Sequence, residues 1–424
     1  MARPRIPFKK RFSAGSLLRA GLRRQRDWPQ MWRTPTPRKA YQVLLVGGGG
    51  HGLATAYYLA RDWGIRDVAV IEKGWLGGGN TGRNTTLIRS NYYYPTSARF
   101  YQRSLKLFER LSNDLNYNVM FSQRGIVTIA FSPHELNLIS RQVNAMQLNG
   151  IDAQLLSRED IQNLLPLCDL SDRARDRCVG GYLHASGGTA RHDAVAWGFA
   201  RAADAFGVDI LQQCEVRGFE ASHGRVSGVH TSLGRISAER IGIAVAGNST
   251  VVADMAGFRL PIRSHTLQAF VSEPLKPLLH TIVMSGLHHL YVSQSDKGEL
   301  VAGGDGDSYT SYSQRGSFQT IERATVGLLE VFPTLSRVRL MRHWGGTVDL
   351  TPDRSPIIDR TPLAGLYIST GWGTGGFKAI PGGGRSFAHL LAHDRTDEFA
   401  QAFTLERFSR GALIDEGAAS GVAH

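Results

Sequence analysis

A glycine-rich segment between two apolar runs is the part of this 424-residue chain whose spacing points most directly to ligand chemistry. It contains Gly47-x-Gly49-x-x-Gly52, and Glu72 follows twenty residues after the last of these glycines. Glycines at this spacing let the backbone turn tightly and approach a pyrophosphate, and a carboxylate at this distance can accept the hydroxyl groups of a ribose. The pattern therefore predicts dinucleotide binding, and Glu72 disfavours a 2′-phosphate.

The residues around this motif predict the elements that would position it. Tyr41–Gly50 reads as a buried strand running into the glycine turn, His51–Gly64 as a helix, and Asp67–Gly74 as a second strand of parallel type. This is a β-α-β unit in which the helix N-terminus, with its partial positive charge, would face the phosphates. The strand, the glycine spacing, the helix and the acidic residue all indicate dinucleotide binding. Together they support this prediction more strongly than the glycines do by themselves.

The segment that follows favours FAD over a nicotinamide dinucleotide. Residues Gly74–Pro95 are rich in Gly, Asn and Thr and include two arginines. They read as a loop and a short helix that would pass over a flavin, whereas a nicotinamide dehydrogenase would continue into a further β-α repeat. An amphipathic helix over Ala98–Leu115 and a strand within Arg124–Ser132 follow instead.

Later segments predict a return to the same domain. Gly207–Thr250 reads as a β-meander, and Leu363–Ala392 as a strand, a glycine-rich loop and a helix, where backbone could again approach a planar ligand. We expect an α/β fold: a Rossmann-type FAD-binding domain with a second, mixed-sheet α+β substrate domain. Both would be discontinuous, with 41–115, 172–245 and 345–424 in the first domain and 116–171 and 246–344 in the second.

Charge and composition narrow the class of protein. Of the formal net charge of +13, residues 1–40 supply about +11, through twelve Lys/Arg and one acid, so the body is nearly neutral and does not resemble a nucleic-acid-binding surface. We interpret residues 1–40 as a solvated or partner-docking extension, with an RNA- or membrane-touching arm as the alternative. The three cysteines read as free thiols of a reducing compartment, and no apolar stretch is long enough for a membrane span.

Several stretches resemble the family of FAD-dependent amine and D-amino-acid oxidases, from about Tyr41 to His424. The resemblance is narrower to the β subunits of heterotetrameric sarcosine oxidases. The stretches that carry it are Val46–Ala60, RNTTLIRSNY (83–92), FSQRG (121–125), ARHDAVAWGFAR (190–201), HHLYVSQ (288–294), RHWGG…TPDRSPII (342–358) and GWGTGGFKAIPG (371–382).

This resemblance implies oxidative demethylation of sarcosine to glycine, with a hydride passing to FAD. Electrons would continue through a covalently bound FMN to O₂, giving hydrogen peroxide. The one-carbon unit would pass to tetrahydrofolate on a partner subunit or leave as formaldehyde. The implied partners are the α, γ and δ subunits of a cytoplasmic complex, with neither nucleic acid nor membrane involved.

Two cations are implied to bind the substrate. In monomeric relatives an Arg in an IIRH-type stretch and a Lys in a GFK stretch hold the substrate carboxylate, and Arg89 and Lys378 stand at the matching positions here. Charge-assisted bonds from both would be short and directional. The alternatives are a surface arginine in a loop and a lysine that extends its amine to solvent beside a glycine loop.

Three residues are implied at an FMN site. Related β subunits carry FMN on the histidine of a KHD stretch, which is His192 here, with Arg191 in place of the lysine. By its sequence position, His192 could instead be an exposed residue near a helix N-cap. His289 and Arg342 are expected as FMN neighbours, although His289 could equally be a core histidine.

The resemblance also implies how FAD is held. Monomeric relatives attach FAD to a cysteine just upstream of the TPD stretch, where this chain has Gly346, so a non-covalent FAD is expected. The expected FAD-binding residues are Gly47, Gly49, Gly50, His51, Gly52, Glu72, Lys73, Asn80, Arg83, Thr85, Val216, Gly373, Gly376 and Lys378. No HExxH, CxxC or GxSxG motif is present, and we expect no metal.

Two other functions stay open from the sequence. One keeps the fold but changes the substrate: a related FAD-dependent dehydrogenase for dimethylglycine, proline or a D-amino acid. The other is a non-catalytic flavoprotein subunit that relays electrons. The RHDAVAW stretch favours the sarcosine oxidase branch over the first alternative, but one methyl group more or less in a substrate changes binding by only about 1–3 kcal/mol.

Overall fold

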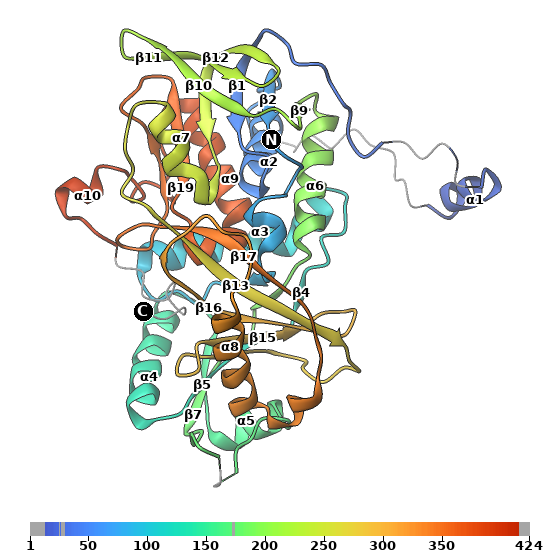
Figure 1. The fold of residues 1–424 in the computed structure, drawn as a ribbon, viewed down its shortest axis with the longest axis vertical. Coiled ribbons are helices and arrows are strands. Elements are labelled where there is room, and N and C mark those ends of the chain that lie inside the picture. The colour runs from blue at the N-terminus through green and yellow to red at the C-terminus, as the bar shows by residue number, and fades with distance from the viewer. Residues whose placement is uncertain (1–12, 25, 27–29, 172–173, 415–424) are drawn as a thin grey trace.

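A computed structural model describes residues 13–24, 26, 30–171 and 174–414. Figure 1 shows two sheet-based parts, one above the other, with strands β13 and β17 running along their junction. The upper part contains β1, α2 and β2, which are Ala40–Val46, Gly50–Asp62 and Val68–Ile71. These bounds confirm the predicted β-α-β unit.

The upper sheet has the order β10-β11-β12-β1-β2-β9, and β19 joins it by pairing with both β12 and β18. Its strands β9, β2, β1, β12 and β19 run parallel to one another. Residues Val43–Val46 of β1 and all four residues of β2 are apolar and buried, as a strand covered on both faces requires. The other bounds are β9 Asp209–Leu211, β10 Val216–Ser222, β11 Arg225–Thr231, β12 Gly234–Ile243, β18 Ile357–Arg360 and β19 Leu366–Thr370.

Helices pack against this sheet around one large apolar core. Helix α2 lies between α6 (His192–Ala205) and α9 (Gly376–His393), and α3 (Pro95–Asp114) packs on α9. A β-carbon on Gly384 would lie 2.5 Å from the β-carbon of Ala54, so the glycines of α9 let it approach α2 closely. This contact brings the start of α9 to the glycine turn of α2.

The lower sheet has the order β17-β13-β16-β15-β14-β5-β7-β6 and is mixed, because β14 and β5 pair in parallel and the other neighbours are antiparallel. Its bounds are β5 Ile126–Ala130, β6 Ala153–Leu156, β7 Gly180–His184, β13 Arg263–Pro274, β14 Ile282–Ser285, β15 Leu290–Gln294, β16 Glu299–Thr310 and β17 Leu340–Leu350. Helices α4 (Pro133–Leu148), α5 (Arg158–Leu164) and α8 (Phe318–Val331) accompany it.

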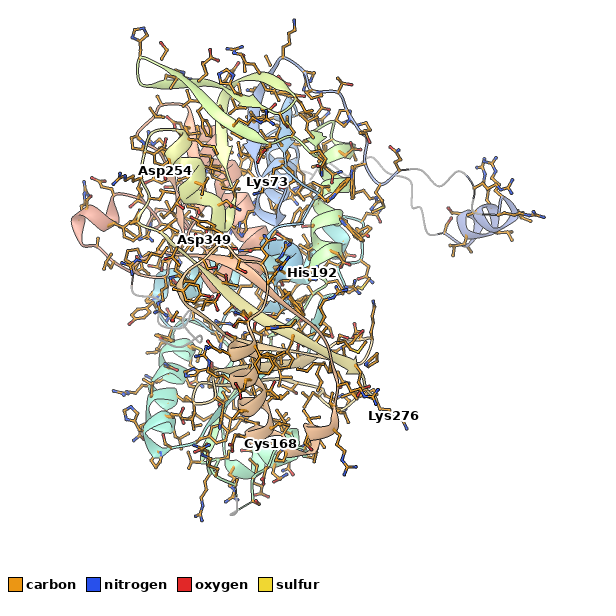
Figure 2. The ribbon with its side chains drawn as sticks, viewed as in Figure 1. Lys73, Cys168, His192, Asp254, Lys276 and Asp349 are labelled. Atoms are coloured by element: carbon orange, nitrogen blue, oxygen red, sulfur yellow. The ribbon has the colours of Figure 1, made fainter. Side chains whose placement is uncertain are left out.

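Short elements complete the described fold. A small sheet of order β3-β8-β4 joins Leu87–Ile88, Gly188–Thr189 and Ser122–Gln123. The remaining helices are α7 Ser249–Met255, α10 Arg407–Arg410 and the 3₁₀ turns η1 Asn80–Arg83, η2 Ala246–Asn248, η3 Pro333–Arg337 and η4 Gly373–Gly375. Figure 2 places Cys168 in the lower part, and Cys168, Cys178 and Cys214 are buried free thiols.

The expected domain boundaries need correction at two strands. Residues 172–245 and 345–424 were assigned to the cofactor domain, but β7 pairs with β5 and β6, and β17 pairs with β13, all within the lower sheet. Strand β18, also within 345–424, pairs with β19 in the upper sheet, which agrees with the expected assignment. A strand's own sequence does not specify its partner, which is chosen by pairing and packing across the whole fold.

The basic extension is described only in part, since residues 1–12, 25 and 27–29 lie outside the described residues. Helix α1 (Ala14–Leu22) has no buried residue and stands away from both sheets in Figure 1. Closer to β1, Arg33 pairs with Asp204 at 2.8 Å and Arg38 with Asp67 at 2.7 Å. These exposed pairs attach the end of the extension to the upper part.

Candidate cofactor and substrate site

The glycine turn after β1 has the geometry that the motif requires. Gly47 has φ +113°, and a β-carbon there would lie 2.3 Å from the carbonyl oxygen of Ala244. A β-carbon on Gly52 would lie 2.0 Å from the carbonyl oxygen of Gly47. Both positions therefore exclude any side chain. Helix α2 begins directly after the turn, and a pyrophosphate can bind at its N-terminus.

Glu72 directly follows strand β2 and lies beside this turn. Its carboxylate accepts hydrogen bonds from the backbone N–H of Gly48 at 2.8 Å and of Gly74 at 2.9 Å. The backbone N–H of Cys214 donates to the Glu72 carbonyl at 2.8 Å, which brings the start of β10, where Val216 lies, to the same end of the sheet. Lys73 is exposed in the turn after Glu72, in the upper part of Figure 2. An adenosine group would thus meet Glu72 and the backbone near Val216.

The loop after β2 folds back onto the helix N-terminus. The backbone N–H of Gly50 donates to Thr81 Oγ1 at 2.9 Å, so a hydroxyl sits at the first turn of α2. Asn80 donates to the carbonyl of Thr347, and Arg83 donates to the carbonyls of Gly78 and Gly79. Thr81 was missed from the sequence, although its position beside Asn80 in the Thr/Asn-rich loop was a usable signal.

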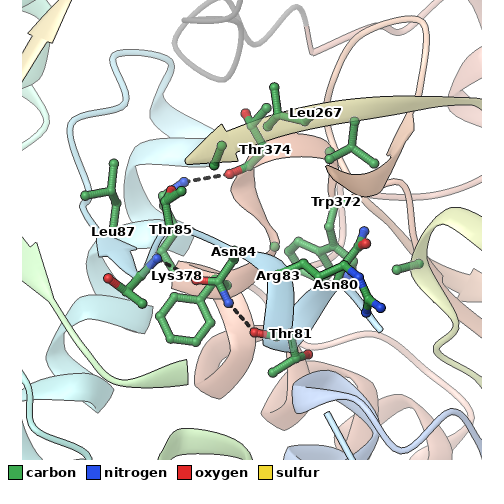
Figure 3. Close-up of a pocket in the computed structure, with 18 of the residues that line it drawn as sticks. Asn80, Thr81, Arg83, Asn84, Thr85, Leu87, Leu267, Trp372, Thr374 and Lys378 are labelled. Carbon is green, nitrogen blue, oxygen red and sulfur yellow. Dashed lines mark hydrogen bonds between the residues drawn. The ribbon is translucent and has the colours of Figure 1, made fainter. Parts of the chain in front are cut away.

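A central cavity lies where the two parts meet, and Figure 3 shows side chains from distant segments converging on it. Nine of the positions discussed from the sequence line it: His51, Asn80, Arg83, Thr85, Arg89, Gly346, Gly373, Gly376 and Lys378. The other lining residues include Thr81, Gln268, Met284, Tyr291, Asp349 and Trp372. Its lining is mostly apolar with a few polar groups, as expected for a planar cofactor and a small substrate.

Arg89 and Lys378 are both buried in the wall of this cavity. Their exposed fractions are 6% and 5%, although 289 positions separate them in the chain. The two sequence alternatives, a surface arginine and a lysine extending to solvent, are therefore wrong. Arg89 follows β3, and Lys378 lies in the first turn of α9, so the positive end of that helix adds to the two cations.

The electrostatics of this pair favour an anion. Burial, with a smaller contribution from the nearby Arg89 charge, lowers the pKa of Lys378 well below its ordinary value. The Lys378 ammonium donates to the carbonyl of Thr374 at 2.9 Å, as Figure 3 shows. A carboxylate entering the cavity would offset both the desolvation and the mutual repulsion of the two cations. The site is therefore suited to a small carboxylate.

Asp349, at the end of β17, positions the loop that leads to Lys378. Its carboxylate accepts from the Thr370 hydroxyl at 2.9 Å and from the backbone N–H groups of Gly371 at 2.6 Å and Trp372 at 3.4 Å. Burial raises the pKa of Asp349, partly offset by these hydrogen bonds. The sequence did not identify Asp349, because nothing in the residues around it indicates which loop it contacts.

His51 presents one free ring nitrogen to the interior. Nε2 lies 2.9 Å from the carbonyl oxygen of Gly376 and must donate to it, and the ring stacks on Trp372 with centroids 4.4 Å apart. Burial lowers the pKa of His51 to about 4, so the ring is neutral. Among the described residues, Nδ1 is buried without a hydrogen-bond partner. This acceptor fits a hydroxyl of a bound cofactor, as expected for FAD.

His192 lies outside the central cavity, at the first position of α6, near the middle of Figure 2. The ring is partly buried, and its Nδ1 has no hydrogen-bond partner in the described part of the chain. Burial lowers its pKa, with the neighbouring Asp193 carboxylate acting in the opposite direction. A neutral imidazole nitrogen is available as a nucleophile, so the residue fits covalent flavin attachment.

The two expected FMN neighbours are both exposed, Arg342 on β17 and His289 in the turn before β15. Arg342 alternates along β17 with Trp344, whose indole N–H donates to the carbonyl of Arg83 at 2.7 Å, so Arg342 lies on the face toward η1. His289 is exposed in the turn before β15 with φ +46°. The other end of β15, where Gln294 accepts from Arg124 at 3.1 Å, is the end near β8 and His192. The structure therefore places His289 neither in the core nor beside His192.

Two kinds of feature are absent from the described residues. No helix there combines the length and the apolar character needed to cross a membrane. Within the same residues, no cluster of three or more His, Cys, Asp or Glu side chains could hold a metal ion.

Comparison with known proteins agrees with this arrangement. The sequence profile of a family described as FAD dependent oxidoreductase matches residues 42–390. The chain belongs to this FAD-dependent oxidoreductase family. The resemblance stated from the motifs and the expected α/β class with mixed sheets are thereby confirmed.

Within the family, the chain is similar over nearly its whole length to sarcosine oxidase β subunits. The subunit of Rhizobium meliloti (strain 1021) is 54% identical over 96% of this chain and 97% of its own length. The subunit of Rhodobacter capsulatus is 51% identical over 98% of this chain and 100% of its own length. The narrower branch indicated by the sequence is thus supported by overall identity as well as by motifs.

Solved structures of other family members share the fold. L-proline dehydrogenase from P. horikoshii superposes with a TM-score of 0.83 at 25% identity, covering 89% of this chain and 100% of its own. Glycine oxidase from Geobacillus kaustophilus gives a TM-score of 0.78 at 19% identity, covering 87% and 99%, which shows the fold only.

Proposed function

We propose that this chain is the subunit of a cytoplasmic sarcosine oxidase complex in which sarcosine is oxidised to glycine. The observation that carries the proposal is the convergence of Arg89 and Lys378 in the central cavity beside the residues that fit FAD. Sarcosine has one carboxylate, and two buried cations are arranged to bind it. The similarity to sarcosine oxidase β subunits at 54% and 51% identity supports this substrate.

The chain's own residues act by binding and orienting the substrate. Bound FAD supplies a two-electron acceptor for the C–H bond next to nitrogen. Arg89 and Lys378 would hold the carboxylate through charge-assisted bonds, which fixes the N-methyl group relative to the rest of the cavity. The mostly apolar walls exclude water and favour the neutral amine, from which a hydride can leave.

The proposal extends to partners and to a second cofactor. We also propose that FMN is bound covalently to His192 and that O₂ is reduced to hydrogen peroxide. The proposed partners are α, γ and δ subunits, one of which binds tetrahydrofolate. The place of His192 at the first position of α6, a turn away from the exposed Trp197, and its buried, unpartnered Nδ1 support attachment there, where another subunit can cover the flavin. Three buried free thiols are typical of a reducing compartment, which supports the cytoplasm.

The test is sarcosine-dependent oxygen consumption by the purified complex, with Arg89→Ala and Lys378→Ala as variants. We expect kcat/KM to fall about 100- to 1,000-fold in each, since each removes a charged bond to the reacting molecule. Bound FAD, measured by absorbance, is the control for folding. Turnover retained by both variants would overturn the substrate site and favour a subunit that only relays electrons.

A substrate panel separates the related enzymes. Dimethylglycine, proline and D-amino acids are compared with sarcosine on the same complex, because L-proline dehydrogenase shares the fold. A kcat/KM for any of these above that for sarcosine would replace the proposed substrate while leaving the carboxylate site in place.

A further inference from the structure

A second cavity lies beside the central cavity, and only two side chains are shared between them. This side cavity has a volume of about 210 Å³ and is bounded by residues of α4, β5, β7 and the β14–β15 turn. Arg89 and Met284 line both cavities, while every other lining residue of the side cavity is absent from the central one. Arg89 and Met284 therefore form the wall between the two.

The Arg89 part of this wall is held in place. Its guanidinium donates to Asn91 Oδ1 at 2.7 Å, and Asn91 in turn donates to the Tyr182 hydroxyl at 2.7 Å. All three side chains are buried. The next backbone N–H, of Ser90, donates to Nε2 of the fully buried His184 at 3.2 Å. Moving Arg89 would break buried hydrogen bonds, which is costly.

The Met284 part of the wall is not held in this way. Its backbone is fixed in β14, between Thr128 of β5 and Tyr291 of β15. Its side chain is an unbranched thioether with several rotatable bonds and no strong hydrogen-bonding group. It can therefore move or be shortened without leaving a buried polar group unsatisfied.

The lining of the side cavity indicates what could occupy it. Ile129, Leu138, Ile139 and Leu290 supply apolar surface, and Tyr93 and Gln142 also line it. A substrate carboxylate bound to Arg89 would lie against the wall, with Cα, which is bonded to that carboxylate, next to it. A group attached to Cα would then point toward the side cavity.

We propose that Met284 determines substrate size by closing the side cavity to groups attached to the substrate's Cα. This inference rests on the proposed function, because it requires Arg89 to hold the carboxylate. Sarcosine carries only hydrogen at Cα and fits with the wall closed. Shortening Met284 joins the two cavities and admits N-methyl amino acids with an aliphatic side chain.

The experiment compares sarcosine, N-methylalanine and N-methylleucine, each enantiomer separately, as substrates of the purified holo-complex. In Met284→Ala we expect the ratio of kcat/KM for N-methylleucine to that for sarcosine to rise at least about tenfold over wild type, in line with the effect of a few methylenes in a pocket. Met284→Val is a milder variant for use if the alanine variant loses FAD.

A second substitution tests whether the side cavity itself is used. Leu138 lines the side cavity from α4, is 42% exposed and lies outside the central cavity. Leu138→Trp should leave sarcosine kinetics unchanged by itself and should cancel the gain in the Met284→Ala background, because the indole fills the side cavity.

Each outcome has a defined meaning. An unchanged substrate ratio in Met284→Ala and Met284→Val, with sarcosine turnover retained, overturns this inference and leaves the proposed function intact. A raised ratio that Leu138→Trp does not reverse also overturns it, since the gain would then come from a looser central cavity. Absence of sarcosine turnover in the wild-type complex overturns the proposed function and this inference with it.

Discussion

The central cavity and the surface around His192 differ in how much of a site this chain supplies. The central cavity is walled by strands of the lower sheet, by the η1 loop that follows β2 and by α9, with Arg89 and Lys378 buried in it. His192 lies at the start of α6. Three apolar side chains near α6 are exposed, with exposed fractions of 45% for Met120, 40% for Trp197 and 69% for Trp75. Met120 follows Val119, whose carbonyl accepts from Arg191 at 3.0 Å.

This difference shows that one chain can supply all the walls of one cavity while the surface around another candidate site stays exposed. Buried cations need a surrounding fold to hold them, and this chain provides it. Exposed large apolar groups mark places where another surface binds. The side chains that line the central cavity all come from this chain, and the contact of the His192 surface with a partner subunit belongs to the proposed function.

The largest effect should come from the glycine turn, on which the central cavity depends. Gly47→Ala places a β-carbon 2.3 Å from the Ala244 carbonyl oxygen at φ +113°. We expect loss of bound FAD and a destabilisation of roughly 3 kcal/mol or more, because clash and strain add. FAD absorbance and thermal unfolding measure this. Gly79→Ala is the matched control, since its β-carbon meets nothing within 4 Å; an equal effect there would contradict the argument.

The next test changes His192, which does not line the central cavity. His192→Gln should abolish acid-stable, peptide-bound flavin and oxygen consumption, while FAD and sarcosine-dependent reduction of an artificial dye persist. Acid precipitation, proteolysis and mass spectrometry of the flavin peptide provide the measurement. His289→Gln is the control, because His289 lies at the other end of β15. If wild-type protein releases all of its flavin, the covalent site is wrong.

A smaller effect should appear in the pH dependence of substrate binding. Burial lowers the pKa of Lys378, so the ammonium loses its proton at a pH below that of an ordinary lysine. The charged form binds the carboxylate, and KM for sarcosine should therefore rise as pH increases through the lowered pKa, by about tenfold per charge-assisted bond lost. Lys378→Arg should flatten this rise. A KM for wild type that falls with increasing pH would show that the sign is wrong.

The smallest effect should come from the residues that position Arg89. Asn91→Ala removes the acceptor at 2.7 Å from the guanidinium. We expect KM for sarcosine to rise about five- to tenfold with a smaller change in kcat, the cost of about 1 kcal/mol for one buried hydrogen bond. Asn91→Asp keeps an acceptor and should restore KM. If thermal stability falls along with the rise in KM, and Asn91→Asp restores neither, the role of Asn91 is merely structural.

Local patterns were sufficient for the elements around the glycine motif. The β-α-β unit, a helix over Ala98–Leu115, observed as α3 (Pro95–Asp114), and the meander to β12 were predicted because each depends on apolar periodicity or on glycine at defined positions. The positions of Arg89 and Lys378 came from a resemblance, and no spacing in the chain would have paired them. Burial of both is consistent with that resemblance.

The errors have a common physical cause. Strand β7 was assigned to the wrong domain, and Asp349 was not recognised as the residue that fixes the turn leading to Lys378. Each depends on which distant segment a strand or side chain meets, and such contacts are selected by packing of the whole chain.

The sequence by itself determined that this chain binds a dinucleotide, because a glycine turn and a carboxylate act through local backbone geometry that short segments specify. Only the tertiary structure decided that Arg89, Lys378 and Met284 line one cavity and that Arg89 and Met284 separate it from a second. Cavities are made of side chains that are far apart in the chain, and their proximity exists only after the two sheets have packed.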